Sequence, residues 1–384
     1  MSKTILILGG YGNTGRLIAQ LLVEELQDIR IIIAGRNLGK AKDLAAKLNR
    51  RAAESVVSSR FIDIAQPNSL LNGITDVDLV VNAASTIQHT GQILRTLLQH
   101  PVDYLDTHLS SPEKLAILQR NHTAIKDAGL CYVTDGGFHP GIPAALIRYA
   151  DMELDELTQA NIYGALRIDW AAIEASRSTW VEFIREFRDY QMLTLRDGQW
   201  QKWSFWKSSS FDFGSPFGRL GCVPMVLEEL KEASRQIPQL RESGFFISGF
   251  NPIMDNFLLP IIMVGASILP TKWYSPLIWL LQIGFRFNRP PFGVKLVADC
   301  QGAKMGKPAN LQIAVAHEDG YWLTAVPVVA TIMQLLYGTI REPGLHLQAN
   351  LVEPQEFIDT LQKLDILVEK TTSYENYQPE PEEH

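Results

Sequence analysis

The sequence contains little cysteine and no metal-ligand pattern. Its three cysteines, Cys131, Cys222 and Cys300, are isolated from one another, so they form neither a disulfide framework nor a cluster with the spacing of a metal site. We therefore expect no metal and a reducing, cytoplasmic compartment. The first apolar run begins almost at the N-terminus, and we expect no signal peptide before it.

The chain also lacks an excess of basic residues. Its 384 residues include 35 Lys and Arg against 42 Asp and Glu, which gives a net charge of −7. A nucleic-acid partner would require a basic face for the phosphates, so we expect none. Apolar residues make up 46% of the chain and charged residues 20%, the ordinary balance of a globular protein, and the length suggests two domains.

No run is long enough to span a bilayer without interruption, although residues 257–285 are unusually apolar. Residues 257–269 carry no charge, residues 271–275 interrupt the run, and residues 276–281 resume it, whereas a spanning helix needs about 20 apolar residues. Three interpretations stay open: a homodimer interface or buried helical hairpin, a monotopic contact with a membrane surface or an apolar substrate, and a spanning helix. Arg286, Arg289 and Lys295 follow the run and agree with the membrane-surface interpretation. We expect a homodimer, with peripheral membrane contact as the alternative.

A glycine-rich turn near the N-terminus is the most informative feature that is present. The uncharged run 5–8 leads into Gly10-x-Gly12-x-x-Gly15, and a helical pattern of apolar residues follows. In a dinucleotide-binding βαβ unit, the first glycine allows a sharp turn, the second lets the backbone approach a pyrophosphate, and the third lets the helix pack close to the strand. The first N–H groups of that helix then face the phosphates. A tight turn that binds nothing is the competing interpretation.

The end of the second strand indicates which nicotinamide cofactor is bound. An acid here would bind the ribose 2′-hydroxyl of NAD, but the sequence has Arg36 and Asn37, with Lys40 one helical turn later. A guanidinium matches a 2′-phosphate, so we predict NADP, with NAD as the alternative. Asp63 follows the third strand and either approaches the adenine amino group or caps a short helix. The predicted cofactor-binding residues are Gly10, Tyr11, Gly12, Asn13, Thr14, Gly15, Arg36, Asn37, Asp63, Ala83, Ala84 and Ser85.

The rhythm of strands and helices predicts an α/β fold with two domains. Six strands up to residue 134 alternate with helices, which indicates a Rossmann-type doubly wound parallel sheet in the order 3-2-1-4-5-6. We expect residues 1–140 with 340–370 to form the dinucleotide-binding domain. Residues 141–339 should form an α+β substrate and dimerisation domain with a mixed or antiparallel sheet, and 371–384 a disordered tail. Within the second domain, residues 318–320 read as a hairpin turn between strands 311–317 and 321–323. The aromatic stretch 198–213 reads as a packed sheet face or as the wall of an apolar substrate site.

Candidate proton-transfer residues follow the sixth strand. Ligands bind beyond the carboxyl ends of such strands, so Ser85, Asp106 and Asp135 should face the crevice. The rigid segment 136–143, rich in Gly and Pro, contains His139, whose imidazole can titrate near neutral pH. We predict Asp135 and His139 as catalytic residues; alternatively, His139 only bonds a turn. Lys304 and His317 are further candidates in the second region.

Several motifs together resemble the saccharopine dehydrogenase-like (saccharopine reductase) family. They are residues 9–15, Ala34-Gly35-Arg36, Asn82-Ala83-Ala84, Gly137-Phe138-His139-Pro140-Gly141 and, near the C-terminus, residues 343–346 and 352–354. The resemblance implies a Rossmann domain, an inserted α/β second domain, and NAD(P)-linked chemistry at a carbon–nitrogen bond. Saccharopine reductases often carry an acid before the Pro-Gly pair. This chain has His139 at that position and departs from the family pattern there.

These observations predict an oxidoreductase that transfers a hydride between NADP(H) and an imine, secondary amine or carbonyl carbon of a small-molecule substrate. The alternative is a nucleotide-binding sensor or interaction protein without turnover, which would use residues 257–285 to contact a membrane or partner. A short-chain-type reductase is not indicated, because Tyr104 is followed four residues later by His108 and not by Lys.

Overall fold

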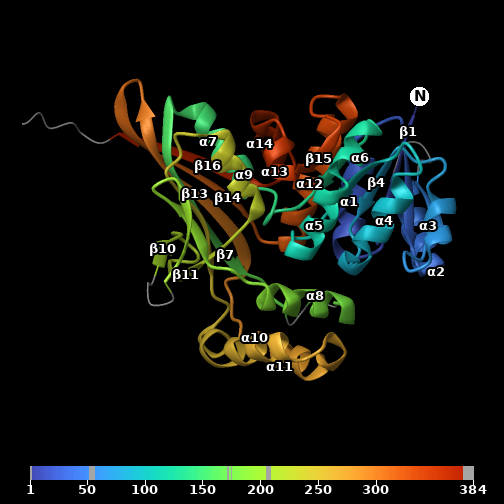
Figure 1. Cartoon of the computed structure of the whole chain (residues 1–384), viewed down its shortest axis with the longest axis horizontal. Coiled ribbons are helices and arrows are strands. Elements are labelled where there is room, and N and C mark those ends of the chain that lie inside the picture. The colour runs from blue at the N-terminus through green and yellow to red at the C-terminus, as the bar shows by residue number, and fades with distance from the viewer. Residues whose placement is uncertain (1, 52–56, 171–172, 174, 205–208, 375–384) are drawn as a thin grey trace, which may run out of the picture.

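The computed structural model describes residues 2–51, 57–170, 173, 175–204 and 209–374. Two sheets organise these residues (Figure 1). Sheet A, of seven strands, lies at the end that holds the N-terminus, and sheet B, of nine strands, lies at the opposite end. Helices α12, α13 and α14 lie between them in this view, and α8, α10 and α11 lie along one edge of the molecule.

Sheet A is the doubly wound parallel sheet that the sequence predicts. Its strands lie in the order β3-β2-β1-β4-β5-β6-β15, so the predicted order is confirmed. A seventh strand, from the C-terminal part, pairs in parallel with β6 and places Gly344 opposite Cys131. Its strands are β1 (Lys3–Leu8), β2 (Ile29–Gly35), β3 (Val57–Phe61), β4 (Leu79–Asn82), β5 (Asp103–Asp106), β6 (Cys131–Thr134) and β15 (Gly344–Leu347). The helices between them are α1 (Asn13–Glu25), α2 (Leu38–Asn49), α3 (Pro67–Gly73), η1 (Ile87–His89), α4 (Thr90–Leu97), α5 (Pro112–Arg120) and α6 (His122–Asp127).

Both faces of sheet A are buried, which explains its uninterrupted apolar strands. Ile5 and Ile7 of β1 belong to one core cluster, and Leu6 and Leu8 belong to another. Successive side chains of a strand point to opposite faces, so a strand covered by helices on both sides needs apolar residues at every position. This arrangement leaves the carboxyl ends of the strands as the edge where a ligand can bind.

Sheet B is mixed, as predicted for the second domain. The order is β10-β11-β12-β7-β13-β14-β16, with β8 attached to β12 and β9 to β8. The β12–β7 pair is parallel, and the other pairs are antiparallel. Its strands are β7 (Glu156–Arg167), β8 (Leu193–Arg196), β9 (Gln199–Lys202), β10 (Ser209–Asp212), β11 (Arg219–Met225), β12 (Glu242–Ser248), β13 (Gly293–Lys304), β14 (Lys307–His317) and β16 (Leu367–Tyr374). The accompanying helices are α7 (Pro143–Glu153), α9 (Glu228–Gln236), α12 (Gly320–Tyr337), α13 (Gln348–Leu351) and α14 (Pro354–Lys363).

The predicted hairpin turn at residues 318–320 is wrong, because this segment starts a helix. Asp319 accepts hydrogen bonds from the N–H groups of Tyr321 (2.8 Å) and Trp322 (3.4 Å), so it caps α12. Among the described helices, α12 is long and apolar enough to cross a membrane by composition, but 67% of its most apolar window is buried inside the protein. It packs against α1 and α14 and is therefore a core helix that joins the two halves.

The C-terminal part contributes to both sheets. Strand β15 extends sheet A, and β16 pairs with β14 along the edge of sheet B, placing Ala309 opposite Tyr374. The prediction of disorder is therefore wrong for residues 371–374, because backbone pairing orders a strand whose side chains are exposed. Residues 375–384 lie outside the described part of the chain.

The aromatic stretch 198–213 packs against sheet B where it is described. Phe211 stacks on Tyr163 with ring centroids 4.2 Å apart, and Trp203 contacts Phe246 edge to face. Phe213 is buried in the same cluster. This favours the interpretation as a sheet face; the predicted members Phe205 and Trp206 lie outside the described residues.

The apolar stretch forms a short helical hairpin that packs on α8 (Arg177–Arg188). It consists of η2 (Met254–Leu258), α10 (Leu259–Ile268), η3 (Thr271–Trp273) and α11 (Ser275–Phe285). A separate apolar cluster joins these elements, with Trp180 and Ile184 of α8 against Ile262 and Phe285. Neither α10, of 10 residues, nor α11, of 11 residues, has the length of a spanning helix.

Candidate functional site

The glycine turn after β1 is packed too tightly for side chains at three positions. A Cβ on Gly10 would lie 2.9 Å from the carbonyl oxygen of Ile7. Gly9 has φ of +70°, and a Cβ there would lie 2.8 Å from the Cβ of Ala84. A Cβ on Gly15 would overlap the carbonyl oxygen of Gly9. The left-handed position of the turn is therefore Gly9, one residue before the glycine to which the sequence pattern assigned the turn. Gly12 donates its N–H to the Gly9 carbonyl at 2.8 Å and opens α1.

A cavity of about 740 Å³ lies at this turn, and we call it the glycine-turn cavity. The carboxyl ends of β1, β2 and β4 and the start of α1 form it, as the switch-point rule for such sheets requires. Of the predicted cofactor residues, nine line it: Tyr11, Gly12, Asn13, Thr14, Arg36, Asp63, Ala83, Ala84 and Ser85. Gly10, Gly15 and Asn37 do not line it.

The adenosine end of the glycine-turn cavity is basic. Arg36 and Lys40 line it together, and both are exposed. The Tyr11 hydroxyl accepts the N–H of Asn37 at 3.0 Å, and the Asn37 side chain caps α2 by accepting the N–H of Lys40 at 3.0 Å. Asn37 thus positions the turn that carries the two cations. A cavity with a side-chain-free turn at one part and two cations at another fits NADP, because the extra phosphate needs cationic partners.

Asp63 lines the cavity but also organises its own turn. Its carboxylate accepts the N–H of Ala65 at 3.2 Å and the side-chain amide of Gln66 at 3.0 Å, just before α3. Each carboxylate oxygen accepts one of these bonds and keeps a second lone pair, so both interpretations of Asp63 from the sequence stay open.

His108 stands where the glycine-turn cavity meets a second cavity. It follows β5, is buried, and its Nε2 lies 2.6 Å from the carbonyl oxygen of Ala84. Its Nδ1 is buried and has no hydrogen-bond partner among the described residues. Ser85, also predicted to face the crevice, lines the glycine-turn cavity and shares a hydrogen bond of 3.1 Å with Thr179 of α8. The part of the glycine-turn cavity formed by residues 83–85 therefore carries an imidazole.

Asp106 and Asp135 belong to a buried ion-pair network beneath this site. Lys114 Nζ lies 2.9 Å from Asp106 and 3.4 Å from Asp135, and Ser110 donates to Asp135 at 2.6 Å. Burial opposes the charge of Asp106, but Lys114 and the neighbouring imidazole hold its pKa below the ordinary value. Burial raises the pKa of Asp135 to about 6 against the pull of Lys114. Asp135 lines none of the three cavities described here, which suits a positioning role; the prediction that it is catalytic stays untested.

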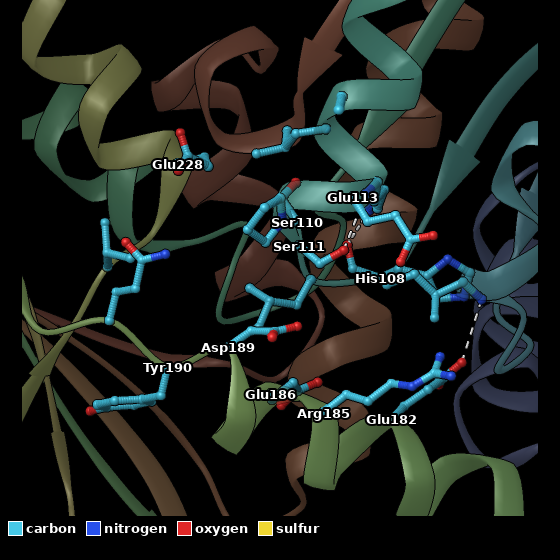
Figure 2. A pocket seen from close by; sticks show the side chains of 18 of the residues that line it. His108, Ser110, Ser111, Glu113, Glu182, Arg185, Glu186, Asp189, Tyr190 and Glu228 are labelled. Atoms are coloured by element: carbon cyan, nitrogen blue, oxygen red, sulfur yellow. Dashed lines mark hydrogen bonds between the residues drawn. The ribbon is translucent and has the colours of Figure 1, made fainter. Parts of the chain in front are cut away.

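The second cavity, of about 600 Å³, is polar (Figure 2). We call it the polar cavity; it lies between the segment after β5 and helix α8. Figure 2 shows Glu182, Arg185 and Glu186 of α8 facing His108, Ser110 and Ser111. Arg185 lines the same cavity, and its Nε is buried without a hydrogen-bond partner among the described residues.

The third cavity, of about 470 Å³, is lined mainly by aromatic and apolar side chains, and we call it the aromatic cavity. His139 lines it beside Phe138, with ring centroids 4.1 Å apart. Burial lowers the pKa of His139 to about 4, so its imidazole is neutral at neutral pH. Its Nδ1 is buried and has no hydrogen-bond partner among the described residues. The proposed catalytic role of His139 stays a prediction.

Helix α8 connects the three cavities. Glu182 lines all three, and Glu186 lines the polar and aromatic cavities. Burial raises the pKa of Glu182, and burial together with Glu182 raises the pKa of Glu186 to about 8. Two carboxyl groups held in this way favour a cationic ligand, which would stabilise their charged forms.

The two other candidates from the sequence lie away from these cavities. Lys304 pairs with Glu153 at 3.4 Å, and His317 accepts the N–H of Asp319 at 2.9 Å through Nδ1. Neither lines any of the three cavities.

Comparison with known proteins agrees with the cofactor site. Residues 5–131 match the family model of the saccharopine dehydrogenase NADP binding domain. Over this range the chain is similar to the NADP-binding domain of the saccharopine dehydrogenase-like family. These likenesses support an oxidoreductase with an NADP-binding domain, as the sequence motifs predict.

Two characterised relatives and one solved structure extend this likeness. Carboxyaminopropylagmatine dehydrogenase of Synechocystis is 26% identical over 72% of this chain and 69% of its own length. Carboxynorspermidine synthase of Vibrio cholerae is 23% identical over 93% of this chain and 94% of its own. Apo saccharopine dehydrogenase (L-Glu forming) from Saccharomyces cerevisiae has the same fold, with a TM-score of 0.68 at 15% identity, covering 97% of this chain and 100% of that one.

Sequence reasoning missed four residues that shape the site: His108, Glu182, Arg185 and Glu186. His108 carried a signal, because it closely follows the fifth strand of a sheet whose strand ends form the crevice. The sequence of helix α8 contains no signal that points to the site. Only the packing of sheet B and the helical hairpin brings this helix to the end of sheet A.

Proposed function

We propose that this protein is an NADP-preferring dehydrogenase or reductase that acts at the carbon–nitrogen bond of a secondary amine carrying both a cationic amine and a carboxylate. The position of Glu182 carries the proposal, because this one carboxyl group lines the glycine-turn, polar and aromatic cavities. A substrate beside it lies next to the cofactor site and extends into both other cavities.

The buried carboxyl groups of α8 suit the cationic part of such a substrate. The aromatic cavity has Trp170, Phe183 and Phe250 along its wall, while Glu182 and Glu186 supply charge. An aliphatic chain with an ammonium group would bury its methylene groups against the rings and pair its charge with the carboxylates. Binding would lower the raised pKa of Glu186 and release its proton.

Arg185 suits the carboxylate of the substrate. Its guanidinium lines the polar cavity, and its Nε has no partner among the described residues. The hydroxyl group of Ser111 lies in the same cavity and accepts the N–H of Lys114 at 3.2 Å, which leaves its own hydrogen free to donate. A guanidinium with a nearby hydroxyl donor is the usual partner of a carboxylate.

The chain's own residues would then position the substrate and handle the proton. Bound NADP supplies or accepts the hydride. His108, held by its 2.6 Å contact with the Ala84 carbonyl, lines the glycine-turn and polar cavities, and neutral His139 lines the aromatic cavity. Both share a cavity with Glu182 and are the candidates to bond the reacting nitrogen. Oxidation of the secondary amine releases a hydride and a proton and leaves an imine, which water splits into an amine and a carbonyl compound.

The names of the two relatives support this substrate class, since carboxyaminopropylagmatine and carboxynorspermidine are both carboxyl-bearing amines. The test is NADPH formation from NADP⁺ with carboxynorspermidine, carboxyaminopropylagmatine and saccharopine. Turnover of at least one, weakened by Arg185→Ala but not by Arg235→Ala, would support the proposal. Arg235 is a suitable control because it lies on α9 and pairs with Glu232. NADP binding without turnover of any of the three would favour the sensor interpretation.

A further inference from the structure

The helical hairpin has two apolar faces, and only one of them is used inside the protein. Met254, Ile262 and Ala266 face the cluster formed with α8 and α11 and are buried. A second stripe, spaced by three or four residues, points outward. Its members and their exposed fractions are Ile253 (40%), Phe257 (67%), Ile261 (55%), Val264 (59%) and Ile268 (74%). An ordinary surface helix would carry polar residues on that second face.

Further exposed apolar side chains widen this surface. Trp273 between the helices and Trp279 on α11 are exposed by 61% and 60%, and Phe287 after α11 by 46%. We call these eight side chains the hairpin patch. The outward stripe from Ile253 to Ile268 runs over about 15 residues, which is ~22 Å of helix. An apolar surface of this extent marks an interaction site in a soluble protein. Figure 1 shows α10 and α11 at the edge of the molecule, beyond α8.

The charge around the hairpin patch is the reverse of that of the whole chain. The protein carries a net charge of −7, yet residues 256–298 contain no Asp or Glu. Asp255, just before this segment, is half-buried and accepts the N–H of Phe250 at 2.9 Å. Lys272, Arg286 and Arg289 in this segment are exposed. Behind them, Arg177 and Arg185 of α8 bond the hairpin through Ser275 (3.3 Å) and Thr271 (3.5 Å). An apolar face with Trp residues and a basic rim, on helices too short to span, is typical of a monotopic contact with anionic lipid.

We propose that the hairpin patch binds the surface of an anionic lipid bilayer, with α10 and α11 lying in the interface. A second copy of this chain suits the patch less well. A two-fold dimer places the same surface against itself, so the basic rims of both copies would face each other without intervening acids. In a bilayer, anionic headgroups would pair with the basic side chains of the rim. The apolar side chains of the stripe would be buried where the headgroups meet the acyl chains.

Docking through the hairpin would also place the site near the membrane. Helix α8 packs directly on α10 and carries Glu182 and Glu186 into the cavities. The aromatic cavity therefore lies one helix away from the proposed lipid contact.

Flotation of the full-length protein with vesicles tests the proposal. Vesicles of phosphatidylcholine alone are compared with vesicles containing one third phosphatidylglycerol, and the oligomeric state is measured by light scattering. The variants are Ile261→Ser with Trp279→Ser, and Lys272→Glu with Arg289→Glu. The matched control is Met305→Ser, because Met305 is 75% exposed in the β13–β14 turn, far from the hairpin in sequence.

We expect the wild type and Met305→Ser to float with the anionic vesicles, and both hairpin variants to lose about tenfold or more in binding. Raised salt should weaken binding of the wild type. The proposal is overturned if the wild type stays at the bottom with both vesicle types. It is equally overturned if the hairpin variants float like the wild type, or if they turn a dimer into a monomer while lipid binding is absent. Thermal melts of the variants establish that they are folded.

Discussion

The preference for NADP over NAD should depend on Arg36. This residue lines the glycine-turn cavity together with Lys40, on the turn fixed by the Tyr11–Asn37 hydrogen bond. In Arg36→Ala, a 2′-phosphate loses a charge-assisted hydrogen bond, which contributes about 1.5–3 kcal/mol. Because Arg36 is exposed, solvent screens the interaction, and we expect the lower part of that range. The Kd for NADPH should therefore rise about 10- to 30-fold.

The measurement is titration of NADPH and NADH by fluorescence or calorimetry at low and high salt. NADH lacks the 2′-phosphate, so its Kd should change less than about threefold in Arg36→Ala. Lys42→Ala is the matched control, since Lys42 is an exposed cation of α2 that does not line the cavity. Lys40→Ala should give a smaller loss in the same direction. An equal loss for both coenzymes, or an unchanged ratio of the two Kd values, would refute the assignment of Arg36.

Three further predictions concern packing, protonation and turnover. Gly15→Ala should lower the free energy of unfolding, measured by urea titration, by about 2–4 kcal/mol, because the new Cβ would overlap the Gly9 carbonyl. Gly91→Ala is the control and should leave the free energy of unfolding unchanged, because the nearest atoms to its Cβ lie 3.7 Å away. The pKa of Glu186 is raised to about 8, so the folded state binds its proton more tightly. Unfolding free energy should therefore fall as pH rises from about 4.5 to 8, and Glu186→Gln should flatten that fall. His139→Ala should lose turnover while calorimetry still detects NADPH binding; full activity would exclude a catalytic role.

The nucleotide-binding half could be predicted from the sequence because its signals are local. An uncharged strand, a glycine turn and an amphipathic helix must follow one another in the chain, and together they set the strand order of sheet A. The assignment of Arg36 to the 2′-phosphate of NADP likewise follows from its position directly after the second strand. The hairpin prediction at residues 318–320 failed for a local reason as well, since an Asp before an apolar run is also a helix cap.

The substrate side of the site depended on contacts between distant segments. Glu182 and Glu186 lie on a helix with no motif. Only the packing of α8 between the helical hairpin and the end of sheet A brings Glu182 beside Ile87 and Glu186 into the same cavity. Asp135 illustrates the same limit, because its position after β6 predicted a crevice residue but Lys114 and Ser110 enclose it. The sequence by itself determined the cofactor turn and the strand order, since these depend on neighbouring residues. The tertiary structure decided which charged groups meet around the substrate and which apolar face of the hairpin stays uncovered, because burial is a property of the whole packed chain.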